Sequence, residues 1–596
     1  MNFETNYLFY IYEQNLVSMR FFITIIIFLL ILSCKHEINI NQSLITDPAE
    51  TWWKEAIVYQ IYPRSFKDTN GDGIGDLQGI IQSLDYVKSL GVTAVWLNPI
   101  YSSPNDDNGY DVSDYRNIMT DFGTMEDFDL LVSEMHKRDL KLIMDIVVNH
   151  SSDEHDWFKQ SRSSRDNPYR DYYHWWPAEK CTPNYRYSLF DPAGDAWKYD
   201  SLTNAYYLHY FSPKQPDLNW SNPKVRKEVN DIMIFWAEKG VDGFRLDAFQ
   251  FAAKDTTFPA FLEGYEKDFI QYYAMQEGVH DYLKGMNEEV FSKYDLLTVS
   301  EGAGRNFKEA HELVDADRGE LQMAYAFEGV DIPKIHGYEL ATVKEVFSNW
   351  DREFSEKGWL SIFLSNHDQA RMVSRWGNDS PEFRALSTKM LNTFIMSMRG
   401  TPYAYYGDEL GMTNIDMGGI EDYQDVAALG GYERTKSQGG DMDVYMAGLQ
   451  KLSRENGRTP MQWDSTQKAG FSNGTSWMLT NPNSKFINVA QQESTKSSVL
   501  NHFRQLTNLR KSNKALIYGA YKLVQESHPD VYAYTRSYKG KRFLVVLNFK
   551  ETETNFDLKT LSSIGTPLLN NYFQLIKEDD VLKLKPYQSL IFELTN

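Results

Sequence analysis

Three stretches of the chain repeat one order of apolar and polar positions: an amphipathic helix, a short turn, and an apolar strand that ends in polar residues. They are residues 84–101, 131–150 and 232–249. Five further apolar runs have the length of strands: 57–66, 296–302, 323–329, 360–368 and 401–411. Helices that alternate with buried strands predict a parallel sheet covered by helices, and eight strands suffice to close it. The pattern therefore predicts an α/β fold, a (β/α)8 TIM barrel.

The stretch GVDGFRLDAF, residues 240–249, places two opposite charges in an otherwise apolar strand. Strand side chains alternate in direction, so Arg245 and Asp247 share one face while Phe244 and Leu246 share the other. Taken alone, this pattern also fits a half-exposed antiparallel strand. In a barrel, however, the C-terminal strand ends form the active site. The other predicted strands also end in polar residues: Asp145, Asn149 and His150, then Glu301, then His367 and Asp368. We therefore expect Arg245 and Asp247 at the mouth of the barrel.

Two regions depart from the barrel pattern. Residues 151–215 are too long for a tight loop and are rich in Trp, Tyr and His, which predicts a small inserted domain after the third strand. From about residue 516 short alternating strands replace the helices, which predicts a C-terminal antiparallel β-sandwich over 516–596. The barrel is then built from 51–150 and 216–515.

The net charge of the chain limits the classes of partner that it can bind. A net charge of −21 and a pI of about 5.1 argue against a nucleic-acid partner, which requires clustered Lys and Arg. An aromatic content of 14% is compatible with stacking on sugar rings, although core packing accounts for most of it. Only two cysteines are present, Cys34 and Cys181, so a disulfide framework is excluded.

The N-terminus reads as a targeting segment. We expect the true start at Met19, followed by an apolar run, Phe21 to Leu32, that is too short to span a bilayer of ~30 Å and fits a signal peptide. Its ending, LILSC, resembles the lipobox of bacterial lipoproteins, which implies removal of the leader 1–34 and lipidation at Cys34. Residues 35–50 would then tether the protein to a membrane of the bacterial cell envelope, periplasmic or outer-membrane associated. An ordinary cleaved signal or a short anchor helix is the alternative.

Three carboxylates, Asp247, Glu301 and Asp368, come from three different strand ends and are expected to converge. Glycoside hydrolysis requires a general acid and a nucleophile or base on opposite faces of the sugar. An adjacent guanidinium, Arg245, can keep the nucleophile ionised. Structural ion pairs could account for each carboxylate singly, but their joint placement at successive strand ends favours catalysis.

The motifs around these residues carry a family resemblance. DIVVNH, GFRLDA, VSEG and LSNHDQ resemble, in order and spacing, the four sequence blocks of the α-amylase family of glycoside hydrolases (family 13), and QPDLNW resembles its fifth block. The opening from Trp52, NDDNGYDVSDY and NGRTPMQWD are similar to the oligo-1,6-glucosidase and α-glucosidase branch. The resemblance runs from Trp52 to the C-terminus.

The resemblance implies roles for individual residues. Asp247 would be the nucleophile, Glu301 the acid/base and Asp368 the transition-state stabiliser. His150 and His367 would bind sugar hydroxyls, and Arg245 would align Asp247. The remaining residues implied to surround the terminal sugar are Asp107, Tyr110, Phe211, Gln215 and Arg458. Closure of the pocket at the non-reducing end implies exo action. For Phe211 and Gln215, packing of the inserted domain is the alternative role.

The residue after the nucleophile, Ala248, bears on linkage. Within the resembling branch, Val at this position accompanies α-1,6 preference, and smaller or more polar residues accompany α-1,4 preference. We therefore expect an exo-acting retaining α-glucosidase that removes terminal α-linked glucose from short oligosaccharides, with maltose-like substrates preferred. If Ala248 only packs the barrel, the inserted domain sets the linkage instead.

The loop DTNGDGIGD is the candidate metal site. It places oxygens at Asp68, Asn70, Asp72, Ile74 and Asp76 in alternation, which suits Ca²⁺ in a structural role, as in the first part of an EF-hand loop. Mg²⁺ could substitute. A polar turn without metal is the alternative, since Gly79 stands where that loop has its bidentate Glu.

Three other functions remain open at this stage. An oligo-1,6-glucosidase would share the fold and the catalytic residues, as would a sucrose-active hydrolase or isomerase that transfers the glucosyl group. The segment between Glu328 and Asp368 lacks the Arg-Leu-Asp-Arg type of motif associated with the isomerases. A non-catalytic subunit of an amino-acid transporter would suit the apolar N-terminus, but the three carboxylates argue against it. The oligomeric state is not predicted.

Overall fold

The computed structural model describes residues 50–559, 561 and 564–595. The predicted leader, Cys34 and all of the tether except Glu50 lie outside the described residues. None of the helices in the described part of the chain combines the length and the apolar character that crossing a bilayer requires.

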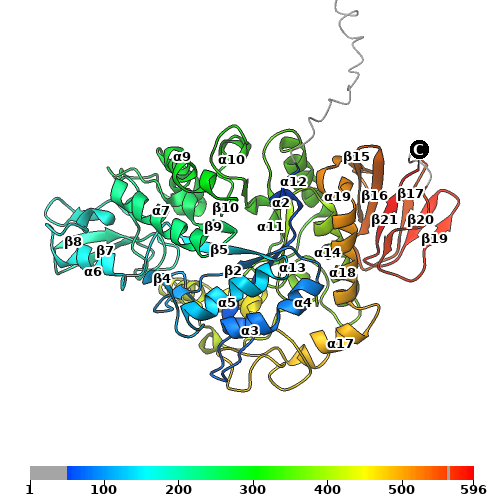
Figure 1. Ribbon diagram of the computed structural model, residues 1–596, viewed down its shortest axis with the longest axis horizontal. Coiled ribbons are helices and arrows are strands. Elements are labelled where there is room, and N and C mark those ends of the chain that lie inside the picture. Colours follow the sequence, from blue (N-terminus) through cyan, green and yellow to red (C-terminus); the bar gives the residue numbers. More distant parts are fainter. Residues whose placement is uncertain (1–49, 560, 562–563, 596) are drawn as a thin grey trace, which may run out of the picture. The chain divides into compact units, whose positions relative to one another are not determined.

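Eight parallel strands form the centre of the molecule (Figure 1). They pair in the order β11-β10-β9-β5-β2-β1-β13-β12, and a parallel bridge between Ala324 and Leu360 closes the sheet into a barrel. The strands are β1 (Val58–Ile61), β2 (Ala94–Leu97), β5 (Lys141–Val147), β9 (Gly243–Asp247), β10 (Leu297–Ser300), β11 (Met323–Ala324), β12 (Ser361–Ile362) and β13 (Thr401–Tyr405). The predicted barrel is confirmed.

A helix, or a pair of helices, follows each barrel strand along the chain and precedes the next barrel strand where there is one. These helices are α3 (Leu77–Gln82) with α4 (Leu84–Ser89), α5 (Met125–His136), α7 (Pro223–Glu238), α9 (Val279–Glu289), α10 (Phe307–Val314), α12 (Leu340–Glu353), α14 (Arg384–Ser397) and α18 (Val499–Ser512). Further helices lie in the connections: α2 (Trp52–Glu55), α6 (Asp156–Ser163), α8 (Ile270–Tyr273), α11 (Phe327–Val330), α13 (Met372–Trp376), α15 (Val426–Ser437), α16 (Met442–Leu452), α17 (Val489–Ser494) and α19 (Ala515–Tyr518).

Helix α5 shows how local sequence sets one of these units. Thr124 and Asp127 form a capping box that satisfies the first free backbone N–H groups. The buried residues Phe128, Leu131, Val132 and Met135 follow at helical spacing. They form one apolar stripe that packs toward the sheet.

The barrel strands bury both faces, as parallel strands covered by helices must. Residues such as Val58, Trp96 and Val299 form the cluster inside the barrel. Their neighbours, including Phe244 and Leu246, belong to the cluster between strands and helices. Arg245 lies on the inner face, with its guanidinium 5.3 Å from the ring centroid of Trp96. The predicted alternation along β9 is therefore confirmed.

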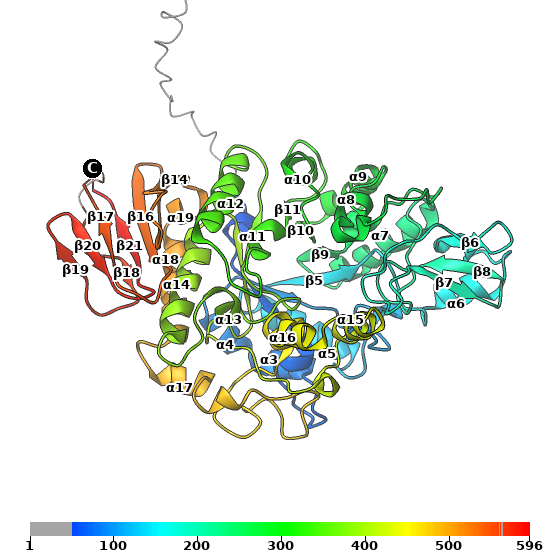
Figure 2. The same ribbon diagram turned by 180° about the vertical axis from the view of Figure 1, so that it is seen from behind.

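Two appended regions flank the barrel (Figure 2). The first region, inserted after β5, the third barrel strand, contains a three-stranded antiparallel sheet of β6 (Trp175–Pro177), β8 (Ala205–Leu208) and β7 (Trp197–Asp200). Apart from these two regions, a hairpin of β3 (Tyr101–Ser102) and β4 (Asp114–Ile118) lies in the connection after β2.

The C-terminal region is a sandwich of two antiparallel sheets. One contains β14 (Ala520–Val524), β15 (Val531–Tyr538), β16 (Lys541–Asn548), β21 (Ser589–Glu593) and β18 (Leu569–Asn570). The other contains β17 (Thr554–Asp557), β20 (Val581–Leu584) and β19 (Ile576–Glu578). A buried apolar cluster with Val546, Phe556 and Leu584 fills the space between them. The expected start at residue 516 falls inside the short helix α19.

Candidate active site

The three predicted catalytic carboxylates surround one cavity at the C-terminal ends of the barrel strands. Asp247 is the last residue of β9, Glu301 follows β10 directly, and Asp368 follows β12. The cavity has a volume of about 220 Å³. Nine predicted residues line it: Asp107, Tyr110, His150, Phe211, Gln215, Asp247, Glu301, His367 and Asp368.

Arg245 joins three carboxylates beneath this cavity. Its Nη1 lies 2.8 Å from Asp145 Oδ1 and 2.5 Å from Asp247 Oδ1, and its Nη2 lies 2.5 Å from Glu301 Oε1. Asp145 and Arg245 are register partners on β5 and β9, which places both side chains on the inner face of the barrel. The guanidinium therefore holds Asp247 and Glu301 through adjacent nitrogens.

Burial separates the protonation behaviour of the carboxylates. It raises the pKa of Glu301 to about 8, even though Arg245 and the backbone N–H of Ala248, 2.8 Å from Glu301 Oε2, favour the ionised form. Burial also raises the pKa of Asp247, and Arg245 opposes that rise. Glu301 thus retains a proton near neutral pH, as a general acid requires.

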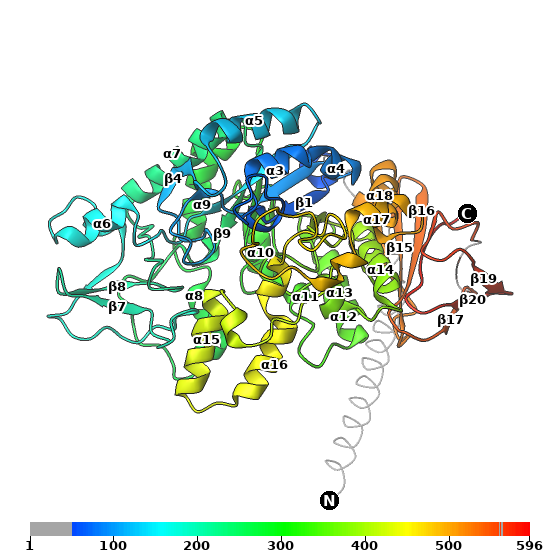
Figure 3. The same ribbon diagram turned by 90° about the horizontal axis from the view of Figure 1, so that it is seen from below.

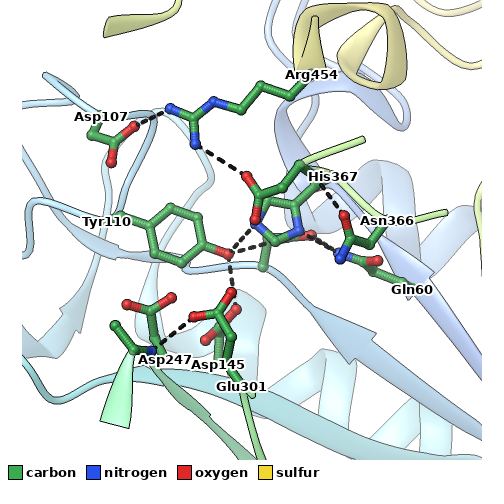
Figure 4. A network of polar contacts seen from close by, with 12 residues as sticks. Gln60, Asp107, Tyr110, Asp145, Asp247, Glu301, Asn366, His367 and Arg454 are labelled. Atoms are coloured by element: carbon green, nitrogen blue, oxygen red, sulfur yellow. Dashed lines mark hydrogen bonds and ion pairs between the residues drawn. The ribbon is translucent and has the colours of Figure 1, made fainter. Parts of the chain in front are cut away.

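A hydrogen-bond chain fixes the orientation of His367 (Figure 4). The Gln60 amide N–H donates to His367 Nδ1 over 2.9 Å, so the proton of the ring lies on Nε2, 2.6 Å from the Tyr110 hydroxyl. That hydroxyl donates to Asp145 Oδ2 and accepts from Asn98. Burial lowers the pKa of His367 well below its ordinary value, so the ring is a neutral donor.

Arg454 closes one side of the cavity (Figure 4). Its Nη2 lies 2.9 Å from Asp107 Oδ1 and its Nη1 lies 3.1 Å from Asp368 Oδ1, while Asp425 accepts from its Nε over 2.6 Å. Burial raises the pKa of Asp107 to about 7. For Asp368 burial acts in the same direction, but the His367 ring, with Nε2 3.1 Å from Asp368 Oδ2, and then the neighbouring guanidiniums hold its pKa well below the usual range. Asp368 is therefore ionised throughout the physiological range.

His150 and the residues around it form the adjoining wall. The Gln215 amide nitrogen lies 3.1 Å from Asp107 Oδ2 and 3.1 Å from His150 Nε2. The ring of Phe211 lies 5.0 Å from that of His150, centroid to centroid. Burial lowers the pKa of His150 to about 3, so this ring is also neutral.

Three predicted residues do not line the cavity. Arg245 lies beneath it, and Arg458 lies behind Asp368, with Nη2 3.1 Å from Asp368 Oδ1 and Nε 3.0 Å from the His367 carbonyl oxygen. Ala248 is 3% exposed and has a left-handed backbone with φ of 47°. Its backbone N–H donates to Glu301 Oε2.

Comparison with known proteins fixes the family. Residues 60–519 match the model of the alpha amylase catalytic domain. The chain belongs to the α-amylase family. Residues 521–591 match the model of the maltogenic amylase C-terminal domain. As a member of this family, the protein is a glycoside hydrolase.

Relatives within the α-amylase family cover nearly all of the described chain. It is 46% identical over 557 residues to the oligo-1,6-glucosidase of Bacillus cereus, which covers 91% of this chain and 99% of that protein. It is 44% identical over 561 residues to the trehalose-6-phosphate hydrolase of Bacillus subtilis, covering 91% and 98%. The crystal structure of an isomaltulose synthase from Protaminobacter rubrum superimposes with a TM-score of 0.90 at 43% identity, covering 92% and 100%.

Three residues that line this α-amylase-family cavity were not predicted: Phe190, Ala427 and Arg454. Arg454 stands four residues before Arg458 in one short 3-10 helix. The family motif NGRTPMQWD contains Arg458 but not Arg454, so only Arg458 was predicted. Phe190 comes from the inserted domain and Ala427 from the first turn of α15. No motif marked either of them.

The candidate calcium loop of this α-amylase-family chain is already rich in internal hydrogen bonds. Asp68 accepts from the backbone N–H groups of Asn70, Gly71 and Gly73 and from the Ser472 hydroxyl. No cluster of three or more His, Cys, Asp or Glu within the described residues is placed to hold a metal.

Other features of the loop fit a cation. Asp68 and Asp76 are both buried, and neither forms an ion pair with a Lys or Arg of the described chain. Asp76 caps α3 by accepting from the Gly79 N–H. Buried anions with hard oxygen donors suit Ca²⁺, provided that some hydrogen bonds of Asp68 open to free its lone pairs.

Proposed function

We propose that the protein is an exo-acting, retaining α-glucosidase that removes terminal α-linked glucose from short oligosaccharides, with α-1,4 linkages preferred. One observation carries the proposal: three carboxylates from separate strand ends surround a cavity that Arg454 closes between Asp107 and Asp368. A cavity closed on one side accepts the end of a sugar chain rather than its middle.

The roles of the carboxylates follow from their surroundings. In the first step Asp247 attacks the anomeric carbon and Glu301 gives its proton to the departing glycosidic oxygen. In the second step Glu301 takes a proton from water, and the resulting hydroxide displaces Asp247 from the sugar. Asp368, kept ionised by two guanidiniums, would hold sugar hydroxyls in both steps.

The spacing of acid and nucleophile supports retention of configuration. Retaining enzymes hold these carboxyls ~5 to 5.5 Å apart, and inverting enzymes leave room for a water at ~6.5 to 9.5 Å. Adjacent nitrogens of Arg245 bind Asp247 and Glu301, which favours the shorter separation.

A second candidate differs in linkage or in the fate of the glucosyl group. Several relatives above 40% identity are named oligo-1,6-glucosidases, which favours α-1,6 bonds. A similar solved structure is named as an isomaltulose synthase mutant from Erwinia rhapontici in complex with its natural substrate sucrose, which favours action on sucrose. Ala248 remains the reason for our α-1,4 preference.

One experiment separates these functions. The protein is incubated with maltose, isomaltose and sucrose, and the products and the anomer first released are followed by NMR. We expect α-glucose first, with maltose cleaved fastest. β-Glucose as the first product would exclude retention, sucrose isomers would indicate transfer, and no turnover of any sugar would favour a non-catalytic role. Asp247→Asn is the matched control, because it is nearly isosteric and removes the nucleophilic charge.

We also propose that Cys34 carries a lipid anchor at the bacterial cell envelope and that the loop from Asp68 to Asp76 binds a structural Ca²⁺. The lipobox-like sequence supports the anchor, and the buried carboxylates of the loop support the ion. Neither group takes part in the steps above.

A further inference from the structure

A second cavity, of about 580 Å³, is formed by three separate parts of the chain. The inserted domain contributes Tyr185 and Tyr187, the connection after β9 contributes Phe261 and Tyr265, and the C-terminal half of α15 contributes Arg434. The cavity that holds the catalytic carboxylates shares none of these residues.

The walls of the second cavity combine aromatic rings with polar groups. Tyr185 is 46% exposed, and its ring lies 6.2 Å from that of Tyr265, centroid to centroid. Flat rings next to hydrogen-bonding groups suit ligands with apolar faces and polar edges, as sugar rings have.

Arg434 leaves one donor unused. Its Nη atoms bind the Tyr187 hydroxyl and the carbonyl oxygens of Ser188, Leu189 and Asp191. Its Nε is buried and lacks a hydrogen-bond partner within the described residues. A buried unpaired N–H is costly, so a turn of the Arg434 side chain that brings Nε to the cavity wall would let a ligand hydroxyl accept from it.

The second cavity is lined by as many acidic as basic side chains. The acidic ones are Glu263 and Glu266, and the basic ones are Lys267 and Arg434. A wall with equal numbers of acidic and basic groups favours an uncharged polar ligand over an anion or a cation.

Two segments run from the catalytic cavity to the second one. On α15, which lies between α16 and the inserted domain (Figure 3), Ala427 lines the first cavity and Arg434 the second. Seven residues separate them, so they share one helix face and stand on the order of 10 Å apart along the axis. On the inserted domain, Phe190 lines the first cavity and Tyr185 the second. This separation is within reach of an oligosaccharide of a few units.

We propose that the second cavity binds the leaving-side sugars of α-gluco-oligosaccharides longer than a disaccharide. The inference rests on the proposed α-glucosidase activity and adds a preference for chain length. Tyr185 supplies a stacking surface, and the Nε–H of Arg434 donates to a sugar hydroxyl.

The test compares short and long substrates. We measure kcat/KM for maltose and maltopentaose, with isomaltose and isomaltopentaose in parallel, on the parent, on Tyr185→Ala and on Tyr185→Ala/Gln438→Ala. Gln438 is an exposed lining residue at the end of α15. We expect disaccharide values to be unchanged and pentasaccharide values to fall roughly 2- to 10-fold in Tyr185→Ala, the worth of one aromatic contact.

Tyr199→Ala is the matched control. Tyr199 is 48% exposed on β7 of the same inserted domain and does not line the second cavity. Equal pentasaccharide losses in both variants, or no loss in Tyr185→Ala, would overturn the site.

A parent that cleaves none of the four sugars refutes the glucosidase proposal instead. Calorimetric titration with maltopentaose then decides on the site: weaker binding by Tyr185→Ala than by Tyr199→Ala supports it, and equal or absent binding refutes it.

Discussion

Arg245 is the residue on which the protonation of the site depends. Two of its nitrogens contact Asp145, Asp247 and Glu301, so one positive charge faces three carboxyls. Ionising all three carboxyls in a buried site beside one positive charge costs free energy. One proton is therefore retained among the three. Burial raises the pKa of all three carboxyls, and that of Glu301 rises furthest, to about 8, so Glu301 holds the proton most strongly. The site is thereby set for acid catalysis near neutral pH.

This arrangement predicts a pH dependence for turnover. Because the acid must be protonated, kcat/KM for maltose should fall as the pH rises through about 8. Glu301→Gln should reduce maltose turnover by roughly 10²- to 10⁴-fold and remove that alkaline limb. Aryl glucosides with good leaving groups should lose much less, because they need little protonation. Equal losses on both substrates, or an unchanged alkaline limb in the variant, would remove Glu301 from this role.

Ala248 leads to a prediction about linkage. Ala248→Val should shift the ratio of kcat/KM toward isomaltose by about 1 to 3 kcal/mol, the usual worth of a methyl-scale pocket change. The left-handed backbone at this position, with φ of 47°, disfavours a β-branched residue, so Tm should also fall.

Ala248→Gly is the control for that variant, because Gly adopts the left-handed conformation without strain. It should keep or raise Tm and leave the linkage preference with maltose. A parent that prefers isomaltose, or a ratio that Val does not move, would contradict the prediction.

Individual site residues differed in how far the sequence could reveal them. Charged residues in a buried strand are conspicuous, and Arg245 and Asp247 could be placed at the barrel mouth because the other predicted strands also end in polar residues. Arg454 could not, because it reaches Asp107 and Asp368 from a short 3-10 helix whose position depends on tertiary packing. The side-chain role expected for Ala248 is likewise complicated by a backbone conformation that strand alternation does not predict.

At the scale of elements, the sequence predicted the strands better than the long connections. The barrel strands follow a regular order of helix, turn and apolar run, and all eight are present. Helices α15 and α16 were not predicted, since α15 contains Gly430 and Gly431, which weaken a helical pattern. Gly430 is required by packing: a Cβ there would stand 2.2 Å from the Phe190 carbonyl oxygen.

The loop from Asp68 to Asp76 carries the prediction about metal. Removing Ca²⁺ with EDTA should lower Tm more than it lowers the rate at mild temperature, because no residue of the loop lines the catalytic cavity. A ligand that binds only the folded state at a hundredfold excess over Kd adds roughly 2.7 kcal/mol of stability.

Asp72→Asn provides the matched comparison for chelation. Asp72 is exposed and accepts from the Ile74 N–H, a bond that the amide oxygen of Asn can also accept. The variant should keep its fold and lose most of the rise in Tm on adding Ca²⁺. An identical Tm with EDTA and with excess Ca²⁺ in the parent would argue that the loop holds itself by hydrogen bonds alone.

At the scale of the whole molecule, the C-terminal domain is joined to the barrel by buried polar contacts. Arg536 on β15 pairs with Asp351 on α12 over 2.8 Å, and the Tyr534 hydroxyl lies 2.7 Å from that of Ser397 on α14. Breaking a buried ion pair by removing one partner is strongly destabilising. The sandwich was predictable from its short alternating strands, but this attachment was not, because it depends on which side chains meet.

The proposed lipid anchor at Cys34 gives the prediction about location. Cys34→Ser should move active enzyme from the membrane fraction to the soluble fraction, since multiple acyl chains anchor stably and their loss leaves no equivalent attachment. Fractionation followed by an activity assay measures this. Enzyme that remains with the membrane after the change would instead favour an uncleaved helix.

The barrel closes where its ladder is shortest. β11 and β12 have two residues each, and Ala324 and Leu360 form the bridge between them, supplemented by the Ser361 hydroxyl, 3.3 Å from the Ala324 carbonyl oxygen. So few cross-strand hydrogen bonds make this seam the place where amide hydrogens should exchange first among the barrel strands. Asp368 follows β12, on one side of the seam, whereas Asp247 and Glu301 follow strands on the other side. Transient opening of the seam would therefore move Asp368 relative to Asp247 and Glu301. A sugar bound in contact with all three carboxylates should slow the amide exchange at the seam.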